Sequence, residues 1–280
     1  MSKTVANHVG VGAGDRRVLF GNNRPLSLIA GPCALEDRDT ALVVADKLAR
    51  LAERLGVGVI FKASYDKANR TSRASQRGVG LAAALPIFRD IKSATGLPVT
   101  TDVHESGDCA VVAEVVDLLQ IPAFLCRQTS LLEAAAHTGK VVNIKKGQFV
   151  SPESMRFAME KVQSEGNDKV LLTERGTTFG YQDLVVDFRG VPTMQDFGAT
   201  VVLDCTHSLQ QPNQSSGVTG GRPALIETIA RAGVAVGVDG LFIETHPRPA
   251  EAKSDGANML PLDKLEPLLE KLVRIRAAIR

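Results

Sequence analysis

The chain has 280 residues, 44% of them hydrophobic and 23% charged, which suffices for a sizeable core in one large domain or two small ones. Its net charge of +2 and its content of no Trp and two Tyr argue against a basic field for nucleic acid and against a stacking surface for single strands. No apolar run reaches the roughly 18 residues of a membrane helix, and the N-terminal sequence lacks the apolar core of a secretory signal.

Short apolar runs alternate with amphipathic stretches along the chain, and this alternation predicts strands followed by helices. Strands are expected at residues 26–30, 57–63, 98–103, 118–121, 141–144, 170–173, 201–204 and 241–244. Helices are expected at residues 39–55, 81–95, 107–115, 129–137, 152–163, 223–233 and 262–279. The first helix should end at Gly56, because glycine is typical of the C-terminal cap.

This repetition of strand and helix over about 250 residues predicts an α/β fold, a (β/α)8 TIM barrel, as a single domain over residues 1–280. A doubly wound open sheet is the alternative, but no GxGxxG motif follows the first strand. Residues 1–25 precede the repeat as an N-terminal extension. The sequence VLFGNNRPLSLIA, with its Gly-Asn-Asn turn, predicts a β-hairpin that covers the N-terminal mouth of the barrel.

Polar or reactive side chains end or closely follow every predicted strand. In chain order they are Cys33, Lys62, Asp102, Gln120, Lys145, Arg175, His207 and Glu244. The carboxyl ends of barrel strands meet at one rim, where the functional residues of such barrels lie. A single lysine at a strand end is more often a solvated cap than a ligand. Strands that all end in this way favour a functional site.

One subset of these residues is cationic. Its members are Lys62, Lys67, Arg70, Arg127, Lys145, Lys146 and Arg175. Arginine binds phosphate or carboxylate with two hydrogen bonds, and lysine supplies a compact charge. Because such groups could not stay charged and close together without anions, we expect ligands with at least two or three anionic groups. No Walker motif or glycine-rich phosphate loop favours a nucleotide.

A second subset contains possible metal ligands. Its members are Cys33, His207, Glu244 and Asp255. In a closed barrel the last strand pairs with the first, so these residues should be neighbours. A thiolate, an imidazole and two carboxylates suit a divalent transition metal. The alternative is a buried structural cysteine beside a hydrogen-bonded histidine.

The remaining cysteines and histidines are expected outside this site. Cys109 and Cys126 are read as structural, Cys205 should face away by strand alternation, and His104 and His246 should lie at the rim or behind the ligands. The cysteines show no CxxC spacing, so reduced thiols and a cytoplasmic location are expected.

A series of motifs resembles one known family. The motifs are IAGPCALE, FKASYDKANRTS, TDVHE, LLQIPAFLCRQT, VNIKKGQF, LLTERGTTFGYQDLVVDFR, DCTHSLQ, GLFIETHP and SDGANMLPL. From about Leu28 to the C-terminal helix, the chain resembles the 3-deoxy-D-manno-octulosonate 8-phosphate synthases, also called 2-dehydro-3-deoxyphosphooctonate aldolases. These transferases condense phosphoenolpyruvate with D-arabinose 5-phosphate and water in lipopolysaccharide biosynthesis.

The resemblance implies a role for each matching residue. The phosphoenolpyruvate pocket would contain Lys62, Ser64, Gln120, Lys145 and Arg175. The arabinose 5-phosphate side would contain Asn69, Arg70, Thr71 and Ser72, with Thr71 standing where other members often have Ser. Lys67 would lie between the substrates as a candidate proton donor. Asp102 and His207 would lie near the reacting carbons, and either Asp102 or a water on the metal is the candidate base.

The resemblance also implies an assembly. Arg127 and Gln128 match residues that reach the sugar phosphate of a neighbouring subunit, and Phe124 would lie at that interface. We therefore expect a homo-oligomer, usually a tetramer in this family.

The metal divides the family. Metal-dependent members carry Cys at the position of Cys33, whereas metal-independent members carry Asn. Together with His207, Glu244 and Asp255, Cys33 implies a divalent metal such as zinc, ferrous iron or manganese. One departure is the segment SDGANML, which combines a Ser-Asp start seen with metal and an Asp-Gly pair common without it.

Two alternatives remain. The 3-deoxy-D-arabino-heptulosonate 7-phosphate synthases share the fold and metal ligands but use erythrose 4-phosphate. They typically read Lys-Pro-Arg-Thr where this chain has KANRT from Lys67 to Thr71, and the inserted Asn favours the longer aldose. A non-catalytic barrel that binds sugar phosphates is the other alternative, although it would be expected to lose residues such as Lys67 and Asp102.

Overall fold

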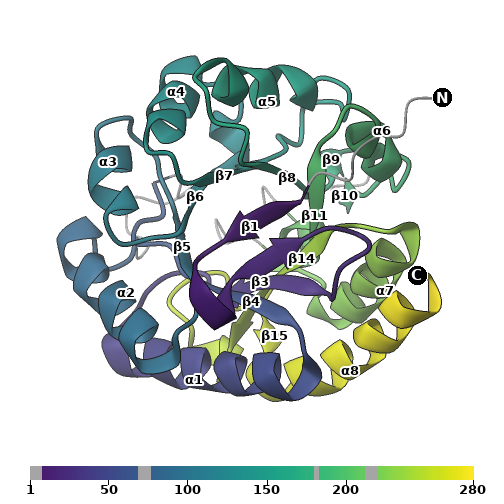
Figure 1. Cartoon of the computed structure of the whole chain (residues 1–280). Coiled ribbons are helices and arrows are strands. Elements are labelled where there is room, and N and C mark those ends of the chain that lie inside the picture. The colour runs from purple at the N-terminus through teal and green to yellow at the C-terminus, as the bar shows by residue number, and fades with distance from the viewer. Residues whose placement is uncertain (1–7, 69–76, 180–182, 212–219) are drawn as a thin grey trace.

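The computed structural model describes residues 8–68, 77–179, 183–211 and 220–280. Within these residues, parallel strands form a closed barrel (Figure 1). The barrel strands are β3 (Ser27–Gly31), β4 (Gly58–Lys62), β5 (Val99–Asp102), β6 (Leu118–Ile121), β7 (Val141–Lys145), β8 (Val170–Glu174), β11 (Thr200–Asp204) and β14 (Gly240–His246). The ring closes because β14 pairs with β3 on one side and with β11 on the other. The predicted TIM barrel is confirmed.

Helices surround the barrel as an outer ring (Figure 1). They are α1 (Arg38–Leu55), α2 (Leu81–Thr95), α3 (Asp108–Ala113), α4 (Thr129–His137), α5 (Met155–Ser164), α6 (Gly190–Asp196), α7 (Ile226–Val236) and α8 (Leu262–Ala278). Each expected helix is present, but the sequence reading missed α6. This helix has 7 residues, GVPTMQD, and its Gly190 and Pro192 give it low helix propensity.

Two apolar layers hold the barrel together. The outer layer packs the helices against the outward faces of the strands. The inner layer fills the barrel with side chains from alternate strand positions. Its strand members are Ile29, Ile60, Leu118, Val141, Leu171, Val202 and Phe242. Since the strands are buried on both faces, they read in the sequence as continuous apolar runs.

A hairpin covers the N-terminal mouth, but its strands differ from the prediction. β1 (Val9–Val11) pairs antiparallel with β2 (Val18–Phe20), and both lie over the barrel opening in Figure 1. The predicted partner, the apolar run at residues 26–30, instead belongs to the barrel strand β3. Both edges of β3 are occupied, by β4 and by β14, so β2 has no edge to join there. The Gly-Asn-Asn segment therefore links the hairpin to the barrel.

Short strand pairs lie at the opposite rim, where the barrel strands end. β9 (Thr177–Thr178) pairs with β10 (Leu184–Val185), β12 (Gln210–Gln211) pairs with β13 (Gly220–Gly221), and β15 (Leu260–Pro261) extends β14. They follow β8, β11 and β14, so they shape the rim at which the barrel strands end. None of the helices in the described segments is long and apolar enough to cross a membrane.

Candidate active site

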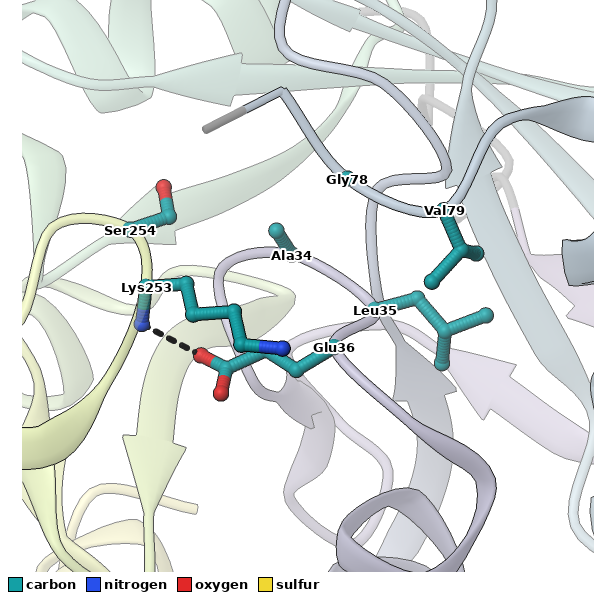
Figure 2. A pocket seen from close by; sticks show the side chains of 7 residues that line it. All are labelled: Ala34, Leu35, Glu36, Gly78, Val79, Lys253 and Ser254. Carbon is teal, nitrogen blue, oxygen red and sulfur yellow. Dashed lines mark hydrogen bonds between the residues drawn. The ribbon is translucent and has the colours of Figure 1, made fainter. Parts of the chain in front are cut away.

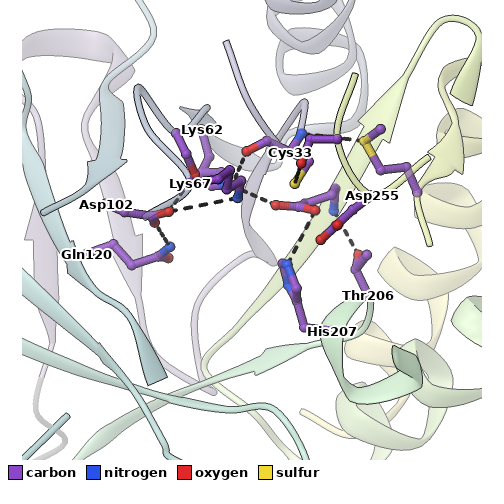
Figure 3. A network of polar contacts seen from close by, with 12 residues as sticks. Cys33, Lys62, Lys67, Asp102, Gln120, Thr206, His207 and Asp255 are labelled. Atoms are coloured by element: carbon purple, nitrogen blue, oxygen red, sulfur yellow. Dashed lines mark hydrogen bonds and ion pairs between the residues drawn. The ribbon is translucent and has the colours of Figure 1, made fainter. Parts of the chain in front are cut away.

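The strand ends deliver their polar side chains to one buried network. Lys62 is the last residue of β4, Asp102 of β5, and Lys145 of β7, and all three are buried. In Figure 3, Lys62 and Lys67 lie between the Asp102–Gln120 pair and the group of Cys33, His207 and Asp255. The expected convergence of these segments at one rim is therefore observed.

Three of the four expected metal ligands form a tight cluster. Sγ of Cys33 and one carboxylate oxygen each of Glu244 and Asp255 lie within 4.8 Å of one another. Cys33 is fully buried, and its Sγ is 3.0 Å from Oγ of Ser254. Burial, together with the charge of Glu244, raises the pKa of the Cys33 thiol to about 12. A bound cation would reverse this shift, because coordination deprotonates a thiol.

His207 completes this group through Glu244. Its Nε2 is 3.4 Å from Oε2 of Glu244, although it falls outside the three-residue cluster. Oε2 is buried and has no hydrogen-bond partner among the described residues. Buried carboxylate oxygens normally accept a hydrogen bond, so an oxygen that has only this 3.4 Å contact fits a cation. The sulfur, nitrogen and oxygen donors suit zinc or ferrous iron.

Lys62 joins this group to the cationic residues. Its Nζ donates to Oε1 of Glu244 at 2.6 Å and to the carbonyl oxygen of Cys33 at 2.9 Å. The two subsets expected from the sequence are thus one network. Our expectation that only ligand anions could hold the cations together was incomplete, because Glu244 already supplies a buried counter-charge to Lys62.

Asp102 organises the neighbouring strand ends. Its Oδ2 accepts a hydrogen bond from Oγ of Ser64 at 2.5 Å, and its Oδ1 accepts one from Nε2 of Gln120. Nζ of Lys67 lies 4.0 Å from Oδ2. Burial alone would raise the pKa of Asp102, but the charges of Lys62 and Lys67 hold it well below its usual range. Asp102 is therefore an ionised carboxylate and a weak base.

Asp204, at the end of β11, is a site residue that sequence reasoning missed. Nζ of Lys145 donates to Oδ2 of Asp204 at 2.7 Å and lies 3.8 Å from the ring centroid of Phe242. Nδ1 of His207 lies 2.6 Å from the same oxygen. An acidic residue ending a predicted strand is the signal that identified Asp102, and it applied equally to Asp204.

Arg175 forms no salt bridge with the residues that the structure describes. Its side chain is buried, and Nη2 donates to Oε1 of Gln210 at 2.7 Å. Nε and Nη1 have no hydrogen-bond partner in the part of the chain that the structure describes. Burial lowers the pKa of Arg175, against the effect of Asp204. A buried guanidinium with two unpartnered nitrogens is arranged to receive an anion.

Comparison with known proteins agrees with this architecture. Residues 4–280 match the model of the DAHP synthetase I family. The chain belongs to this family. It is 56% identical to a 2-dehydro-3-deoxyphosphooctonate aldolase of Rhodopseudomonas palustris (strain HaA2) over 278 residues, which cover 99% of this chain and 96% of the relative. Proteins of the same name from Brucella ovis and Brucella melitensis biotype 2 are also 56% identical, over 256 residues, which cover 91% of this chain and 92% of each relative.

Not every expected residue of this DAHP synthetase I family member joins the network. Lys146 directly follows β7 and is buried, and its Nζ donates to Oγ1 of Thr177 at 3.1 Å and to the carbonyl of Val150 at 3.3 Å. Its inclusion in the cationic subset was wrong, because successive strand residues face opposite sides. Cys205 packs in the outer layer, as expected from the same alternation.

Of the residues expected to contact the sugar phosphate, the structure describes Arg127 and Gln128. Arg127 and Gln128 are exposed just before α4, and within the described residues no contact joins them to the network. Asn69, Arg70, Thr71 and Ser72 lie outside the described residues.

A small pocket lies beside the Cys33 cluster in this family member (Figure 2). Its lining consists of Ala34, Leu35, Glu36, Gly78, Val79, Lys253 and Ser254, and its volume is about 100 Å³. The backbone N–H of Lys253 donates to Oε1 of Glu36 at 2.8 Å across one side. Ser254, which contacts Cys33, connects the pocket to the network.

Proposed function

We propose that the chain condenses phosphoenolpyruvate with D-arabinose 5-phosphate and water, giving 3-deoxy-D-manno-octulosonate 8-phosphate and phosphate for lipopolysaccharide biosynthesis. The similarity to relatives named 2-dehydro-3-deoxyphosphooctonate aldolase, at 56% identity over nearly the whole chain, supports it. The structural observation that carries it is Arg175, a buried cation at the rim of the barrel with two nitrogens that have no hydrogen-bond partner among the described residues.

The phosphoenolpyruvate pocket would be built around this guanidinium. Nε and Nη1 of Arg175 can bind one phosphate or carboxylate group through two parallel hydrogen bonds. Lys62 and Lys145 supply further positive charge from fixed positions, because each is already held by a carboxylate. Ser64 and Gln120 are oriented by Asp102 and complete the proposed pocket.

The aldose would meet phosphoenolpyruvate at Lys67, with Asn69, Arg70, Thr71 and Ser72 on the sugar-phosphate side. Burial opposes the charge of Lys67, but Cys33, Glu244 and Asp102 outweigh it and raise the pKa of the ammonium. A protonated Lys67 can neutralise the charge that develops on the aldehyde oxygen as the enol carbon attacks. Water then adds to the resulting cationic carbon, and phosphate leaves by C–O cleavage. Asp102, as a weak base, would serve mainly to orient Lys67 and Ser64.

We also propose that Cys33, His207, Glu244 and Asp255 hold a divalent metal. When bound, it would supply Lewis acidity to the aldehyde or to a water. Removing the metal with a chelator, or the Cys33→Ala substitution, is expected to lower the rate of phosphate release by at least about a hundredfold. Full activity in metal-free protein, checked by elemental analysis, would refute the metal role.

We further propose a cytoplasmic homotetramer in which Arg127 and Gln128 complete a neighbouring site. Phe124, at 58% exposure, gives this surface an apolar centre. Light scattering would measure the assembly, and a monomer that retains full activity would contradict the proposal.

Substrate choice tests the function. Phosphate release from phosphoenolpyruvate is expected with arabinose 5-phosphate and to be much slower with erythrose 4-phosphate. The reverse preference would identify a heptulosonate phosphate synthase, which the family description also covers. Binding of the substrates without phosphate release would identify a non-catalytic barrel.

A further inference from the structure

The carboxylate of Asp204 contacts His207, a proposed metal ligand, and Lys145, a residue of the proposed phosphoenolpyruvate pocket. It is fully buried at the end of β11, and four donors surround its two oxygens. Oδ1 accepts from the backbone N–H of Thr206 at 3.0 Å and of His207 at 2.8 Å. Oδ2 lies 2.6 Å from Nδ1 of His207 and accepts from Nζ of Lys145 at 2.7 Å.

The bonds to Oδ1 shape the chain that carries the histidine. They fold residues 204–207 into a tight turn of the type that aspartate forms with backbone groups two and three residues ahead. The turn directs the imidazole of His207 back toward the same Asp204 carboxylate whose Oδ1 accepts the two backbone hydrogen bonds. Backbone and side chain of His207 are therefore fixed by the same residue.

The bond to Nδ1 also fixes which ring nitrogen carries a hydrogen. A carboxylate oxygen only accepts hydrogen bonds, so Nδ1 of His207 must be the donor. Nε2 is then the nitrogen that faces Oε2 of Glu244, at 3.4 Å. If both Nε2 of His207 and Oε2 of Glu244 bind a cation, no hydrogen is required between these two atoms. A carboxylate behind a metal-binding imidazole commonly fixes the ring in this way.

The same oxygen holds Lys145 in place. Nζ of Lys145 lies 2.7 Å from Oδ2 and 3.3 Å from Nδ1 of His207. The ammonium and the imidazole therefore share one acceptor, and neither can shift without changing the bond of the other. No other carboxylate in the described residues forms a salt bridge with Lys145.

We propose that Asp204 is a positioning residue that couples the metal ligand His207 to the phosphoenolpyruvate-binding Lys145. The inference rests on the proposed function, because it assumes that the site binds both a metal and phosphoenolpyruvate. Asp204 contacts neither, and acts by setting the tautomer of one side chain and the position of the other.

The test is Asp204→Asn, with Asp239→Asn as the matched control. An asparagine amide has one oxygen and one NH₂ group, so it cannot accept from both pairs of donors. Asp239 is also a buried aspartate, and it accepts from the backbone N–H of Val201 at 2.7 Å, but it precedes β14 at the opposite end of the barrel. The control therefore reports the general cost of losing a buried carboxylate.

Two affinities are measured by calorimetry on each folded protein, for Zn²⁺ added to metal-stripped protein and for phosphoenolpyruvate. Asp204→Asn is expected to weaken both by about tenfold or more, and Asp239→Asn to leave both unchanged. Unchanged affinities in Asp204→Asn, or equal losses in both variants, would overturn the inference. If the unsubstituted protein binds neither probe, the proposed function itself fails, which is a distinguishable result.

A second measurement needs no folded Asp204 variant. Imidazole ¹⁵N shifts of the zinc-loaded unsubstituted protein, assigned for His207 by comparison with His207→Gln, report which ring nitrogen carries hydrogen. Protonated Nδ1 is expected. An Nδ1 without hydrogen in His207 would show that Asp204 does not fix the ring and would refute the coupling.

Discussion

Two buried arginines differ in how their nitrogens are used. Arg276 donates from Nη1 to the carbonyl of Asn22 at 3.0 Å and from Nη2 to the carbonyl of Val238, and among the described residues only its Nε lacks a hydrogen-bond partner. Arg175 uses only Nη2 for the protein, with Nε and Nη1 unpartnered among the described residues. Burying a cation costs free energy unless partners compensate. The first arginine therefore suits a structural role, and the second suits anion binding.

The Arg175→Lys substitution should weaken phosphoenolpyruvate binding by about tenfold to a hundredfold, because charge-assisted hydrogen bonds contribute roughly 1.5–3 kcal/mol. Lysine keeps the charge but cannot bind in parallel through two nitrogens. Calorimetric titration measures the change. Arg276→Lys is the control, and it should lower the melting temperature while leaving phosphoenolpyruvate affinity unchanged. An Arg175→Lys protein with unaltered affinity would remove Arg175 from the pocket.

At the scale of single elements, helix α1 depends on one carboxylate. Asp37 is its N-cap, and its side chain accepts from the backbone N–H of Thr40 at 2.7 Å. This bond holds the pKa of Asp37 below its ordinary value of 3.8. The stabilisation is therefore present above the unfolded pKa and is lost as pH falls through the folded one.

Asp37→Ala should lower the free energy of unfolding by about 1 kcal/mol at neutral pH. The difference from the unsubstituted protein should shrink below pH 3.8, where the carboxyl becomes protonated. Urea unfolding at several pH values measures it. Asp37→Asn keeps the cap without the charge, so its stability should show less dependence on pH. A cost of Asp37→Ala that stays constant down to acid pH would contradict this account.

Strand alternation explains what the sequence could and could not predict about the site. The apolar runs located every barrel strand, because strands buried on both faces have few polar positions. Lys145 and Lys146 are adjacent, and alternation separates their roles: the first faces Asp204 and the second ties down outer loops. The sequence analysis placed both lysines in one cationic subset because it did not assign their side chains to a face of the barrel wall. Asp204 was missed although it also ends a predicted strand, and only the structure shows its contact with Nδ1 of His207.

Elements at the margins of the barrel were harder to predict than the barrel strands. Helix α6 is short and carries glycine and proline, so tertiary packing rather than propensity maintains it. The strand pairing of the hairpin was misassigned because 18–20 and 27–31 are both apolar runs across a turn. Only closure of the barrel, which occupies both edges of β3, decides which run joins the hairpin.

On the scale of the whole molecule, the two ends of the barrel differ in chemistry. The carboxyl end contains buried charges such as Lys62, Glu244, Lys145 and Asp204. Buried ion pairs recover little more than their desolvation cost, so this end contributes little stability. At the N-terminal end, the interior of the barrel is apolar and is closed by Val9, Val11, Val18 and Phe20 of the hairpin. We infer that the apolar end stabilises a fold whose functional end is electrostatically costly.

Substitution of Phe20 tests whether the N-terminal end of the barrel supplies stability independently of the functional end. It is fully buried, and its ring packs so closely over the start of β14 that a Cβ on Gly240 would lie 2.6 Å from it. Phe20→Ala should lower the free energy of unfolding by about 3–5 kcal/mol through lost burial and a residual cavity. Because the ring lies at the end opposite the charged network, phosphoenolpyruvate affinity of the folded fraction should stay unchanged.

The control for this experiment is the neighbouring residue of the same strand. Leu19 is 36% exposed and faces away from the barrel, so Leu19→Ala should cost only about 1 kcal/mol or less. Denaturant unfolding compares the two variants, and calorimetry with phosphoenolpyruvate follows binding below the transition. Equal costs for both would show that the hairpin does not fill the barrel. A loss of affinity in Phe20→Ala without unfolding would show that the two ends are coupled rather than independent.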